Sequence, residues 1–400
     1  MFIPFSPPDI REEDVEAVAA VLRSGWITSG PVGAEFSEAL STYCDTVDTV
    51  LVNSCTSGLE LSLRALGVGP GDEVIVPAYT YTASASVIDH VGAKIVMVDV
   101  EPGSFFVSAG TFESAITDRT KAIIAVDMAG VMNDTRPIYE AIERRKELFV
   151  PTNQLQEQIG RVALIIDAAH SLGASREGYR AGSVADFTAF SFHAVKNLTT
   201  AEGGALTWNK NLPVDHKELG ALLRVLTLHG QNKSALEKSK ASSWEYDIVS
   251  PAYKMNLPDI LAAMGYSQFK RYDSILDRRH EIVARYDEIL ADTDTVALRH
   301  SGEDFRSSGH LYLLRLNGYS QEDRNQFIAD MHSQGVSCNV HYKPLPALTA
   351  YRNLGFKTSD YPNSMAQYSN EVTLPLHTCL TDEQVDYVAN AARNLLLSRP

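Results

Sequence analysis

The chain has 400 residues, of which 44% are hydrophobic and 21% charged, a composition typical of a soluble globular protein with a large core. Its formal net charge of −15 argues against a general nucleic-acid binder, because such proteins neutralise phosphates with an excess of cations. No apolar run is long enough to span a membrane, and the four scattered cysteines form neither a zinc site nor a disulfide framework. The N-terminus lacks a signal-peptide pattern, so we expect a cytoplasmic protein. Because the cysteines are scattered, we expect no metal site.

The first predicted elements alternate between helices and strands. Residues 13–25 have the apolar period of an amphipathic helix that ends at Gly25, and residues 34–44 predict a second helix. A β-branched run at 49–54 predicts a strand, and the sequence from 56 to 68 returns to the helical period. The stretch GDEVIVPAYTYTASASVIDHVG is typical of a turn, strand, loop and helix in that order. Further apolar, β-rich runs predict strands at 94–100, 121–130, 163–170 and 186–192.

Strands that are apolar throughout and alternate with helices indicate a mainly parallel sheet covered on both faces, and hence an α/β fold. Ligands on such sheets bind beyond the carboxyl ends of the strands. Four residues with useful chemistry follow predicted strands, namely Thr56, Tyr81, Asp167 and Lys196. We therefore expect these side chains to meet at one edge of the sheet.

The character of the sequence changes near residue 250. Residues 251–290 predict two long helices that connect to a second domain, and the pattern of that domain indicates an α+β structure. Its predicted strands are 310–316 and 336–343, and its predicted helices are 321–335 and 381–396. We expect a large α/β domain over 1–250 and a smaller α+β domain over 251–400. The polar stretch 144–161 is expected to be a surface excursion without an assigned role.

Asp167 ends the apolar run ALIID, so its carboxylate is expected to be buried. A buried carboxylate is costly unless it meets a positive charge or hydrogen-bond donors. A protonated pyridine nitrogen is one such partner, and the carboxylate keeps that ring cationic so that it accepts electrons from a substrate carbanion. The competing interpretation is a structural aspartate that caps the following AAHSLG turn.

Lys196 lies in SFHAVKNLTTAEGG, just after another predicted strand. A lysine desolvated among apolar neighbours has a lowered pKa and acts as a nucleophilic amine, which is what imine formation with an aldehyde requires. The competing interpretation is an ordinary surface lysine on a loop.

The stretch NSCTSGLEL, residues 53–61, places hydroxyls and free N–H groups where a predicted strand ends and a helix begins. That arrangement suits a phosphate monoester, although Ser and Thr are also common as plain helix caps. An anion site, a buried aspartate and a lysine at one strand edge are together what a pyridoxal phosphate enzyme needs.

The chain resembles the DegT/DnrJ/EryC1/StrS family of nucleotide-sugar aminotransferases. The resemblance runs nearly end to end, through GWITSGP, GDEVIVPAYTYTAS, DAAHSLGA, SFHAVKNLTTAEGG, YKMNLPDI, VHYKPL and TLPLH. It implies the type I, aspartate-aminotransferase-like fold of pyridoxal phosphate (PLP) transferases, with a large domain built on a mainly parallel sheet and a smaller α+β domain.

The resemblance also implies roles around the cofactor. Lys196 would bind the cofactor aldehyde as an imine and move the substrate proton, and Asp167 would pair with the pyridinium nitrogen. His170 would approach the 3-oxygen of the ring, and Tyr81 would stack on its face unless it is simply a core aromatic. The phosphate would be held by the hydroxyls of Thr56, Ser57 and Ser191.

Other implied residues concern the partner subunit and the sugar. Asn256 of YKMNLPDI would reach the phosphate in the neighbouring subunit of a homodimer with shared active sites. Trp26 and Thr28 belong to the GWITSGP loop that shapes the sugar pocket, and His341 lies in the segment that faces the substrate. His193 is either a further substrate contact or the histidine of an ordinary turn, and both interpretations stay open.

Three alternative functions remain to be weighed. Sugar 3-dehydratases of the same family use pyridoxamine phosphate (PMP) and carry His where this chain has Lys196, which favours transamination. A non-catalytic PLP-binding regulator is expected to carry an added DNA-binding module, for which the family motifs leave no room. A nicotinamide oxidoreductase is disfavoured because no GxGxxG follows a predicted strand.

The sequence thus predicts a homodimeric aminotransferase that uses PLP, with PMP as its intermediate form. Its amino donor would be L-glutamate, and its acceptor a nucleotide-linked, UDP-type 4-keto sugar destined for a surface polysaccharide or glycan. Both a 4-keto pentose and a 2-acetamido-4-keto-6-deoxyhexose fit the motifs, and we favour the second. We expect neither a nucleic acid nor a membrane as partner.

Overall fold

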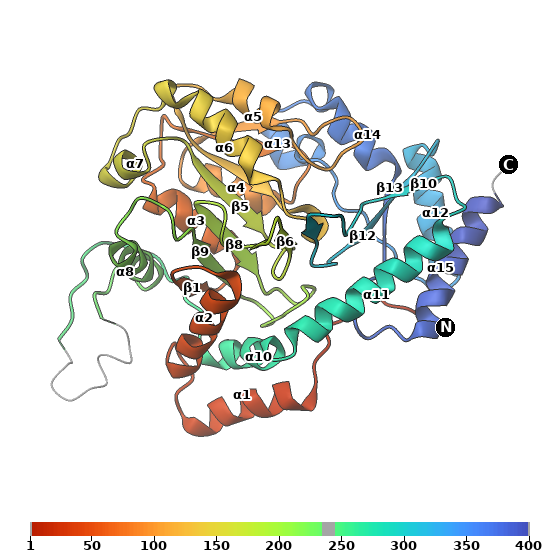
Figure 1. Cartoon of the computed structure of the whole chain (residues 1–400), viewed down its shortest axis with the longest axis horizontal. Coiled ribbons are helices and arrows are strands. Elements are labelled where there is room, and N and C mark those ends of the chain that lie inside the picture. Colours follow the sequence, from red (N-terminus) through yellow and green to blue (C-terminus); the bar gives the residue numbers. More distant parts are fainter. Residues whose placement is uncertain (1, 234–244, 399–400) are drawn as a thin grey trace.

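The computed structural model describes residues 2–233 and 245–398. Its larger part is built on a seven-stranded sheet with the order β1-β9-β8-β5-β4-β2-β3 (Figure 1). The strands are β1 (Thr49–Val52), β2 (Glu73–Pro77), β3 (Lys94–Val98), β4 (Thr120–Val126), β5 (Ala163–Ala168), β8 (Phe187–Ser191) and β9 (Gly204–Trp208). Neighbouring strands from β8 to β3 are parallel, and only β9 runs antiparallel to its neighbours β8 and β1. The predicted mainly parallel sheet is confirmed.

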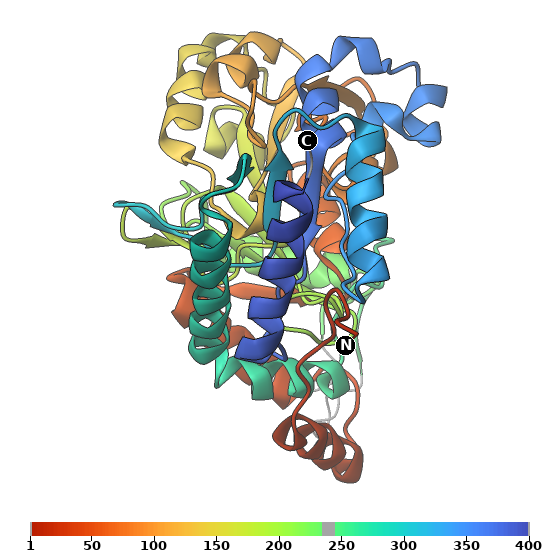
Figure 2. The same cartoon turned by 90° about the vertical axis from the view of Figure 1, so that its right-hand side faces the viewer.

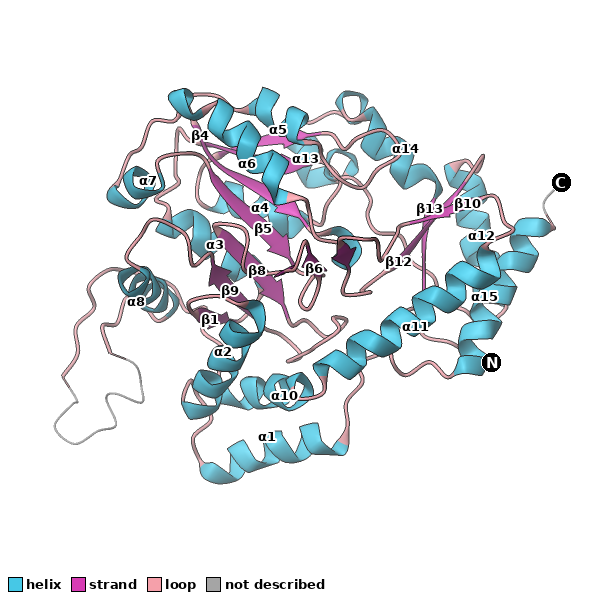
Figure 3. Ribbon diagram, viewed as in Figure 1, coloured by secondary structure: helices cyan, strands magenta, loops and turns pink. Residues whose placement is uncertain are grey.

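Helices cover both faces of this sheet (Figure 3). On one side lie α2 (Pro31–Cys44), α5 (Ala109–Ala115) and α6 (Thr135–Arg144); on the other lie α3 (Cys55–Ala65), α4 (Thr82–His90) and α8 (His216–Thr227). Alternate residues of one strand therefore enter different hydrophobic clusters. Ile75 packs with the first set of helices, whereas Val74 and Val76 pack with the second. Because both faces are buried, residues 74–77 of β2 are all apolar, as the sequence indicated.

The C-terminal part is an α+β unit on an antiparallel sheet of order β10-β12-β13. Its main elements are α11 (Tyr272–Leu290), β10 (Thr295–Ala297), β12 (Tyr312–Leu316), α12 (Gln321–Ser333), β13 (Glu371–Leu374) and α15 (Asp382–Leu397). Figure 2 shows α11, α15 and α12 side by side, and they enclose a third hydrophobic cluster with this sheet. The predicted strand 310–316 and helices 321–335 and 381–396 agree with β12, α12 and α15.

One predicted strand of this unit is wrong. Residues 336–343 form only isolated bridges, which join Val336 to Ile3 and Asn339 to Thr373. The third strand of the sheet is instead β13, where all four residues are buried. Residues 336–343 form an extended segment that leaves the sheet. At His341 this segment reaches the site described below.

The remaining elements complete the two parts. They are α1 (Glu12–Ser24), α7 (Gln154–Ile159), α10 (Asp259–Phe269), α13 (Thr349–Asn353), α14 (Pro362–Asn370), and the short strands β6 (Ser175–Arg176), β7 (Tyr179–Arg180) and β11 (Phe305–Arg306). The stretch 144–161 is more than a surface excursion, because the buried Gln156 in α7 donates a hydrogen bond to the Leu66 carbonyl, 2.7 Å away. No helix within the described ranges has both the length and the apolar character needed to cross a bilayer.

The packing links the two parts across the predicted division at residue 250. Helix α10 packs against α1 and α2 of the larger part. Ile3 belongs to the C-terminal cluster, whereas Leu345 and Tyr351 pack in the cluster with α3 and α4. The division at residue 250 stays a prediction, and chain segments from both sides of it cross between the parts.

Candidate active site

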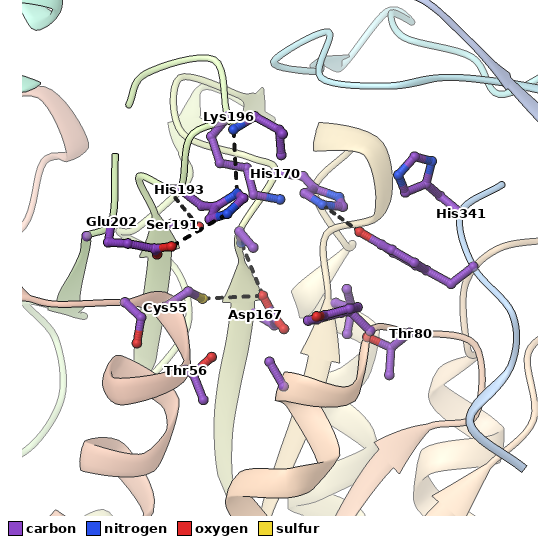
Figure 4. Close-up of a pocket in the computed structure, with 18 residues that line it drawn as sticks. Cys55, Thr56, Thr80, Asp167, His170, Ser191, His193, Lys196, Glu202 and His341 are labelled. Atoms are coloured by element: carbon purple, nitrogen blue, oxygen red, sulfur yellow. Dashed lines mark hydrogen bonds and ion pairs between the residues drawn. The ribbon is translucent and has the colours of Figure 1, made fainter. Parts of the chain in front are cut away.

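A cavity of about 330 Å³ opens at the carboxyl edge of the parallel strands, a volume in the range of small-molecule sites. The ends of β4, β5 and β8, the segments that follow β1, β2, β5 and β8, and the turn before β9 supply most of its wall, and the segment after residue 340 closes one side (Figure 4). Eight of the predicted site residues line it: Thr56, Tyr81, Asp167, His170, Ser191, His193, Lys196 and His341. The expected convergence at one sheet edge is therefore present.

Lys196 lies in the turn after β8, where its main-chain N–H donates to the His193 carbonyl at 2.9 Å. Burial lowers the pKa of its amine to about 8, although the nearby Asp167 carboxylate raises it. A substantial fraction of the amine is therefore neutral in mildly alkaline solution. That is the form in which a lysine acts as a nucleophile or takes up a proton.

Asp167 is buried at the end of β5 and is held by uncharged donors. The Ser84 hydroxyl donates to Oδ2 at 2.6 Å, the Ala169 main-chain N–H to Oδ1 at 3.1 Å, and the Cys55 thiol to Oδ1 at 3.5 Å. Such donors orient the carboxylate and satisfy its buried oxygens. The carboxylate also lines the cavity, where a cationic ring nitrogen would complete its environment.

His170 is buried beside Asp167, and its protonation can be assigned from its partners. Nδ1 accepts the main-chain N–H of Ala129 at 3.2 Å, so a neutral imidazole carries its proton on Nε2. Nε2 lies 3.1 Å from the Tyr342 hydroxyl. Burial and the nearby Lys196 hold the pKa of His170 well below its usual range, so it is a neutral donor. A donor at this place suits an oxyanion such as the 3-oxygen of a pyridoxal ring.

The start of α3 forms another part of the wall. Ser54 is its cap, since the Ser54 hydroxyl accepts the Ser57 main-chain N–H at 3.1 Å, and Thr56 faces the cavity. The Ser57 hydroxyl instead donates to Asn53 Oδ1 at 2.6 Å, and Ser57 is not part of the lining. The capping interpretation of this segment therefore applies to Ser54, while the phosphate role of Ser57 stays a prediction. Ser191 lines the opposite side of the helix start.

The Glu-Gly-Gly sequence near Lys196 has a steric reason. A Cβ on Gly204 would lie 2.6 Å from the carbonyl carbon of Ser54 and 2.7 Å from the nitrogen of Cys55, both of them main-chain atoms. A Cβ on Gly203 would lie 2.1 Å from the Thr200 hydroxyl. Gly204 therefore lets β9 lie directly against the start of α3, whereas Gly203 is required by the turn that contains Thr200.

Tyr81 and His193 are two exposed residues of the cavity lining. The Tyr81 side chain is 59% exposed, with its ring 5.8 Å from that of Tyr342, so a face remains free for a planar ligand. His193 is exposed and lies 3.7 Å from a carboxylate oxygen of Glu202. Both interpretations of His193 remain open, because it belongs at once to a turn and to the cavity lining.

Three predicted residues lie away from this cavity. The Trp26 indole donates to the Ser29 carbonyl at 3.2 Å, and the Thr28 carbonyl accepts the Asp259 main-chain N–H at 3.1 Å. The Asn256 amide donates to the Ser29 hydroxyl at 2.6 Å, and these two line a separate hollow of about 410 Å³. The roles predicted for them at a partner's site or in a sugar pocket stay predictions.

Several contacts of the site were not predicted. Ser84 and Cys55 hold the Asp167 carboxylate, and Tyr342 pairs with His170. Tyr342 directly follows His341 in VHYKPL, so the motif that marked His341 could also have pointed to Tyr342. Ser84 lies in the first turn of the serine- and alanine-rich helix α4, where its sequence carries no mark of a contact with β5.

Comparison with known proteins identifies the group to which this architecture belongs. The pattern of the DegT/DnrJ/EryC1/StrS aminotransferase family matches residues 8–393. The chain belongs to this family. Spr1654 from Streptococcus pneumoniae, described as a sugar aminotransferase and solved in its PMP form, has 50% sequence identity and a TM-score of 0.96 over 99% of each chain. The same protein has also been solved in a PLP form, with a TM-score of 0.95.

Two curated relatives of the family cover nearly the whole chain. The spore coat polysaccharide biosynthesis protein SpsC of Bacillus subtilis (strain 168) is 35% identical over 99% of this chain and 97% of its own. The UDP-4-amino-4-deoxy-L-arabinose–oxoglutarate aminotransferase of Shewanella sediminis (strain HAW-EB3) is 33% identical over 99% and 98%. The predicted family, fold class and aminotransferase character are confirmed, and the predicted cofactor agrees with the forms in which Spr1654 has been solved.

Proposed function

We propose that this chain is a PLP-dependent aminotransferase that moves an amino group from L-glutamate to a UDP-linked 4-keto sugar. The observation that carries the proposal is the joint placement of Lys196 and Asp167 on one cavity, in a chain of the DegT/DnrJ/EryC1/StrS aminotransferase family. A desolvated amine and a buried carboxylate with only uncharged donors are the pair that a pyridoxal ring requires.

The lining residues fit the cofactor along its length. Lys196 would face the aldehyde, Asp167 the ring nitrogen and the His170 Nε2–H the 3-oxygen, while the exposed Tyr81 ring is free to cover one face. The start of α3 at Thr56 offers main-chain N–H groups to the phosphate. When bound, PLP supplies an electron sink that stabilises negative charge at the substrate carbon.

The protein groups then control where the proton goes. The neutral Lys196 amine takes the proton from the α-carbon of the donor amino acid and returns one to the sugar carbon in the second half-reaction. Asp167 keeps a positive charge at the ring nitrogen favourable throughout. Because a single lysine serves both half-reactions, its partly deprotonated state at working pH is essential.

The proposed class of sugar substrate is based on the names of two relatives. One relative acts, by its name, on a UDP-linked 4-amino pentose with oxoglutarate, and another belongs to polysaccharide biosynthesis. We propose the same type of UDP-linked 4-keto substrate here, with the 2-acetamido-6-deoxyhexose favoured over the pentose. A homodimer would bring Asn256 and the loop of Trp26 and Thr28 to the neighbouring site, since they lie outside the cavity of their own chain.

We also propose a cytoplasmic location. All four cysteines are free thiols, as is usual in a reducing compartment.

The test offers the PLP-loaded protein L-glutamate with each of the two UDP-4-keto sugars in separate reactions. We expect a UDP-amino sugar and equimolar 2-oxoglutarate from at least one acceptor, detected by mass spectrometry. The matched control is Lys196→Ala, which should form neither product. Release of water with a 3-deoxy sugar, instead of amino transfer, would identify a dehydratase and contradict the proposal.

A further inference from the structure

A chain of hydrogen bonds leads from His341, at the cavity wall, to a carboxyl group deep in the C-terminal unit. His341 Nδ1 lies 2.9 Å from the Thr373 hydroxyl, and that hydroxyl lies 2.6 Å from Glu371 Oε1. Glu371 and Thr373 are both fully buried in β13. Figure 4 shows His341 on the side of the cavity opposite Cys55 and Thr56. The three side chains connect this cavity to a proton-carrying group that does not itself face it.

The protonation state of Glu371 determines which ring nitrogen of His341 carries the proton. Glu371 Oε2 accepts the main-chain N–H of His341 at 2.9 Å, so a proton on Glu371 must sit on Oε1. With Glu371 ionised, the Thr373 hydroxyl donates to it, and His341 Nδ1–H donates to Thr373, which leaves Nε2 as an acceptor. With Glu371 protonated, both bonds reverse, and the proton of a neutral His341 sits on Nε2 as a donor.

The surroundings of Glu371 make both arrangements accessible. Burial raises the pKa of the Glu371 carboxyl to about 8, although its hydrogen bonds and the Arg324 guanidinium of α12 lower it. Arg324 also donates to the Glu371 main-chain carbonyl at 2.7 Å. The other titratable neighbours, Tyr79, Tyr342 and Cys338, have pKa values raised by burial and are neutral near pH 8.

The surroundings of His341 exclude the alternative of a charged imidazole. Burial and the Lys196 amine lower the pKa of His341 to about 3. The two other histidines that face it, His170 and His310, are buried and have pKa values well below the usual range. A net proton can therefore pass through His341 only if one ring nitrogen gains a proton as the other loses one.

We propose that Glu371, Thr373 and His341 form a proton relay that delivers one proton to a substrate oxygen in the cavity and takes one back. The relay rests on the proposed function, since an aminotransferase must protonate the carbonyl oxygen of its keto substrate. His341 is the member that meets substrate, and Thr373 and Glu371 are positioning residues behind it.

The proton count of the relay is balanced. When an amine adds to the carbonyl carbon, the C–N bond forms, the π electrons of C=O move to oxygen, and that oxygen takes the proton from His341 Nε2. The Thr373 hydroxyl proton moves to Nδ1, the Glu371 proton moves to Thr373, and Glu371 becomes a carboxylate. The surplus proton of the added nitrogen later restores Glu371 by the reverse path.

The experiment reads the tautomer of His341 directly, in protein loaded with PLP and labelled with ¹⁵N in histidine. Long-range ¹H–¹⁵N NMR spectra distinguish the two tautomers, and His341→Asn assigns the signal. In the wild type we expect the proton to sit on Nε2 below about pH 8 and to move to Nδ1 above it. One tautomer over the whole range from about pH 6 to 10, which brackets that pKa, would overturn the relay.

Two variants test the chain of bonds. In Glu371→Gln the amide oxygen must take the Oε2 place, because only an acceptor suits the His341 main-chain N–H, so the NH₂ group donates to Thr373. This variant should lock His341 in the Nε2–H tautomer at every pH. Thr373→Val removes the link and should make the tautomer independent of pH. The matched control Glu73→Gln, at a buried glutamate paired with Lys94 and Arg119, should titrate like the wild type.

The outcomes separate the relay from the proposed function. A tautomer change that persists in Glu371→Gln or in Thr373→Val overturns the relay, whether or not the protein reacts with L-glutamate. A tautomer change that is lost in both variants supports the relay, and the reaction with L-glutamate then tests the aminotransferase independently.

Discussion

At the scale of single residues, burial changes the pKa of Lys196, and hydrogen bonds orient Asp167. The lysine loses hydration and its pKa falls to about 8, so it approaches the neutral form that a nucleophile needs. The aspartate is buried too, and its oxygens accept hydrogen bonds from the Ser84 hydroxyl and the Ala169 N–H. The same edge of the sheet thus holds a lysine with a lowered pKa and a carboxylate that hydrogen bonds hold in place.

Replacing Lys196 tests whether its amine, and not only its charge, is needed. Lys196→Ala and Lys196→Arg should each lower turnover with L-glutamate by at least about 10³-fold, because a guanidinium does not deprotonate at working pH. Steady-state assays measure the loss, and thermal unfolding should show a folded protein in both cases. Appreciable turnover by the arginine variant would show that positive charge alone suffices.

Asp167→Asn isolates the charge of the carboxylate. The amide can still accept the Ala169 N–H and donate to Ser84, so the fold should persist. We expect both half-reactions to slow by about 10²-fold or more, because an uncharged partner no longer favours a protonated ring. Stopped-flow absorbance measures each half-reaction.

Ser84→Ala is the matched control for Asp167→Asn. It keeps the charge of Asp167, removes one hydrogen bond worth about 1 kcal/mol, and should lower the rate by about 10-fold or less. Equal rates in Asp167→Asn and the wild type would make the aspartate structural.

At the scale of elements, the site depends on how closely β9 approaches the start of α3. Gly204→Ala places a methyl group within 2.7 Å of main-chain atoms of Ser54, Cys55 and Phe190, so the helix start must move. We expect a clear fall in the thermal unfolding midpoint and at least about 10-fold weaker binding of PLP, because the N–H groups proposed to bind its phosphate would shift. Equilibrium titration with PLP measures the affinity.

Gly69→Ala is the control for that prediction. The nearest atom to its new methyl would be the Val91 carbonyl oxygen at 3.8 Å, which is ordinary contact. This variant should bind PLP like the wild type. If Gly204→Ala binds equally well, the close approach of β9 does not set the phosphate site.

The sequence predicts elements well where the apolar pattern is decisive, and less well elsewhere. Strands buried on both faces, such as β4 and β5, and the long amphipathic helices are found within a few residues. Strand β9 was not predicted, although it is wholly buried, because no period distinguishes GALTW from a buried turn. Residues 336–343 alternate like a strand, yet they meet the sheet at single bridges only.

The candidate site was predicted where residues follow strand ends or carry motif spacing. Asp167, His170 and Lys196 lie together as expected. The contacts that hold site residues escaped prediction when they come from distant segments, as Ser84 does for Asp167 and Glu371 for His341, because no local pattern marks a hydrogen bond between elements far apart in the chain.

At the scale of the whole molecule, the account requires a second copy of the chain. Asn256 lines a hollow separate from the cavity that holds Lys196, so its predicted role at the cofactor phosphate requires the neighbouring subunit. Size-exclusion chromatography with light scattering should therefore give twice the 43.9 kDa mass of one chain.

A mixture of two variants tests the shared site itself. Lys196→Ala and Asn256→Ala should each be impaired alone, since every site in either homodimer lacks one group. Unfolded together and refolded in equal amounts, they form mixed dimers in which one of the two sites is intact. Activity should then rise to about one quarter of the wild type, as random pairing gives. Activity no higher than the mean of the two separate variants would mean that Asn256 serves its own chain or none.

The most direct test of the central claim is the absorption spectrum of the purified protein with PLP, before and after L-glutamate is added alone. We expect a yellow band that is absent in Lys196→Ala and that L-glutamate converts to the near-ultraviolet band of PMP, with release of one 2-oxoglutarate per site. A yellow band that glutamate leaves unchanged would contradict the proposed amino donor and the aminotransferase account built on it.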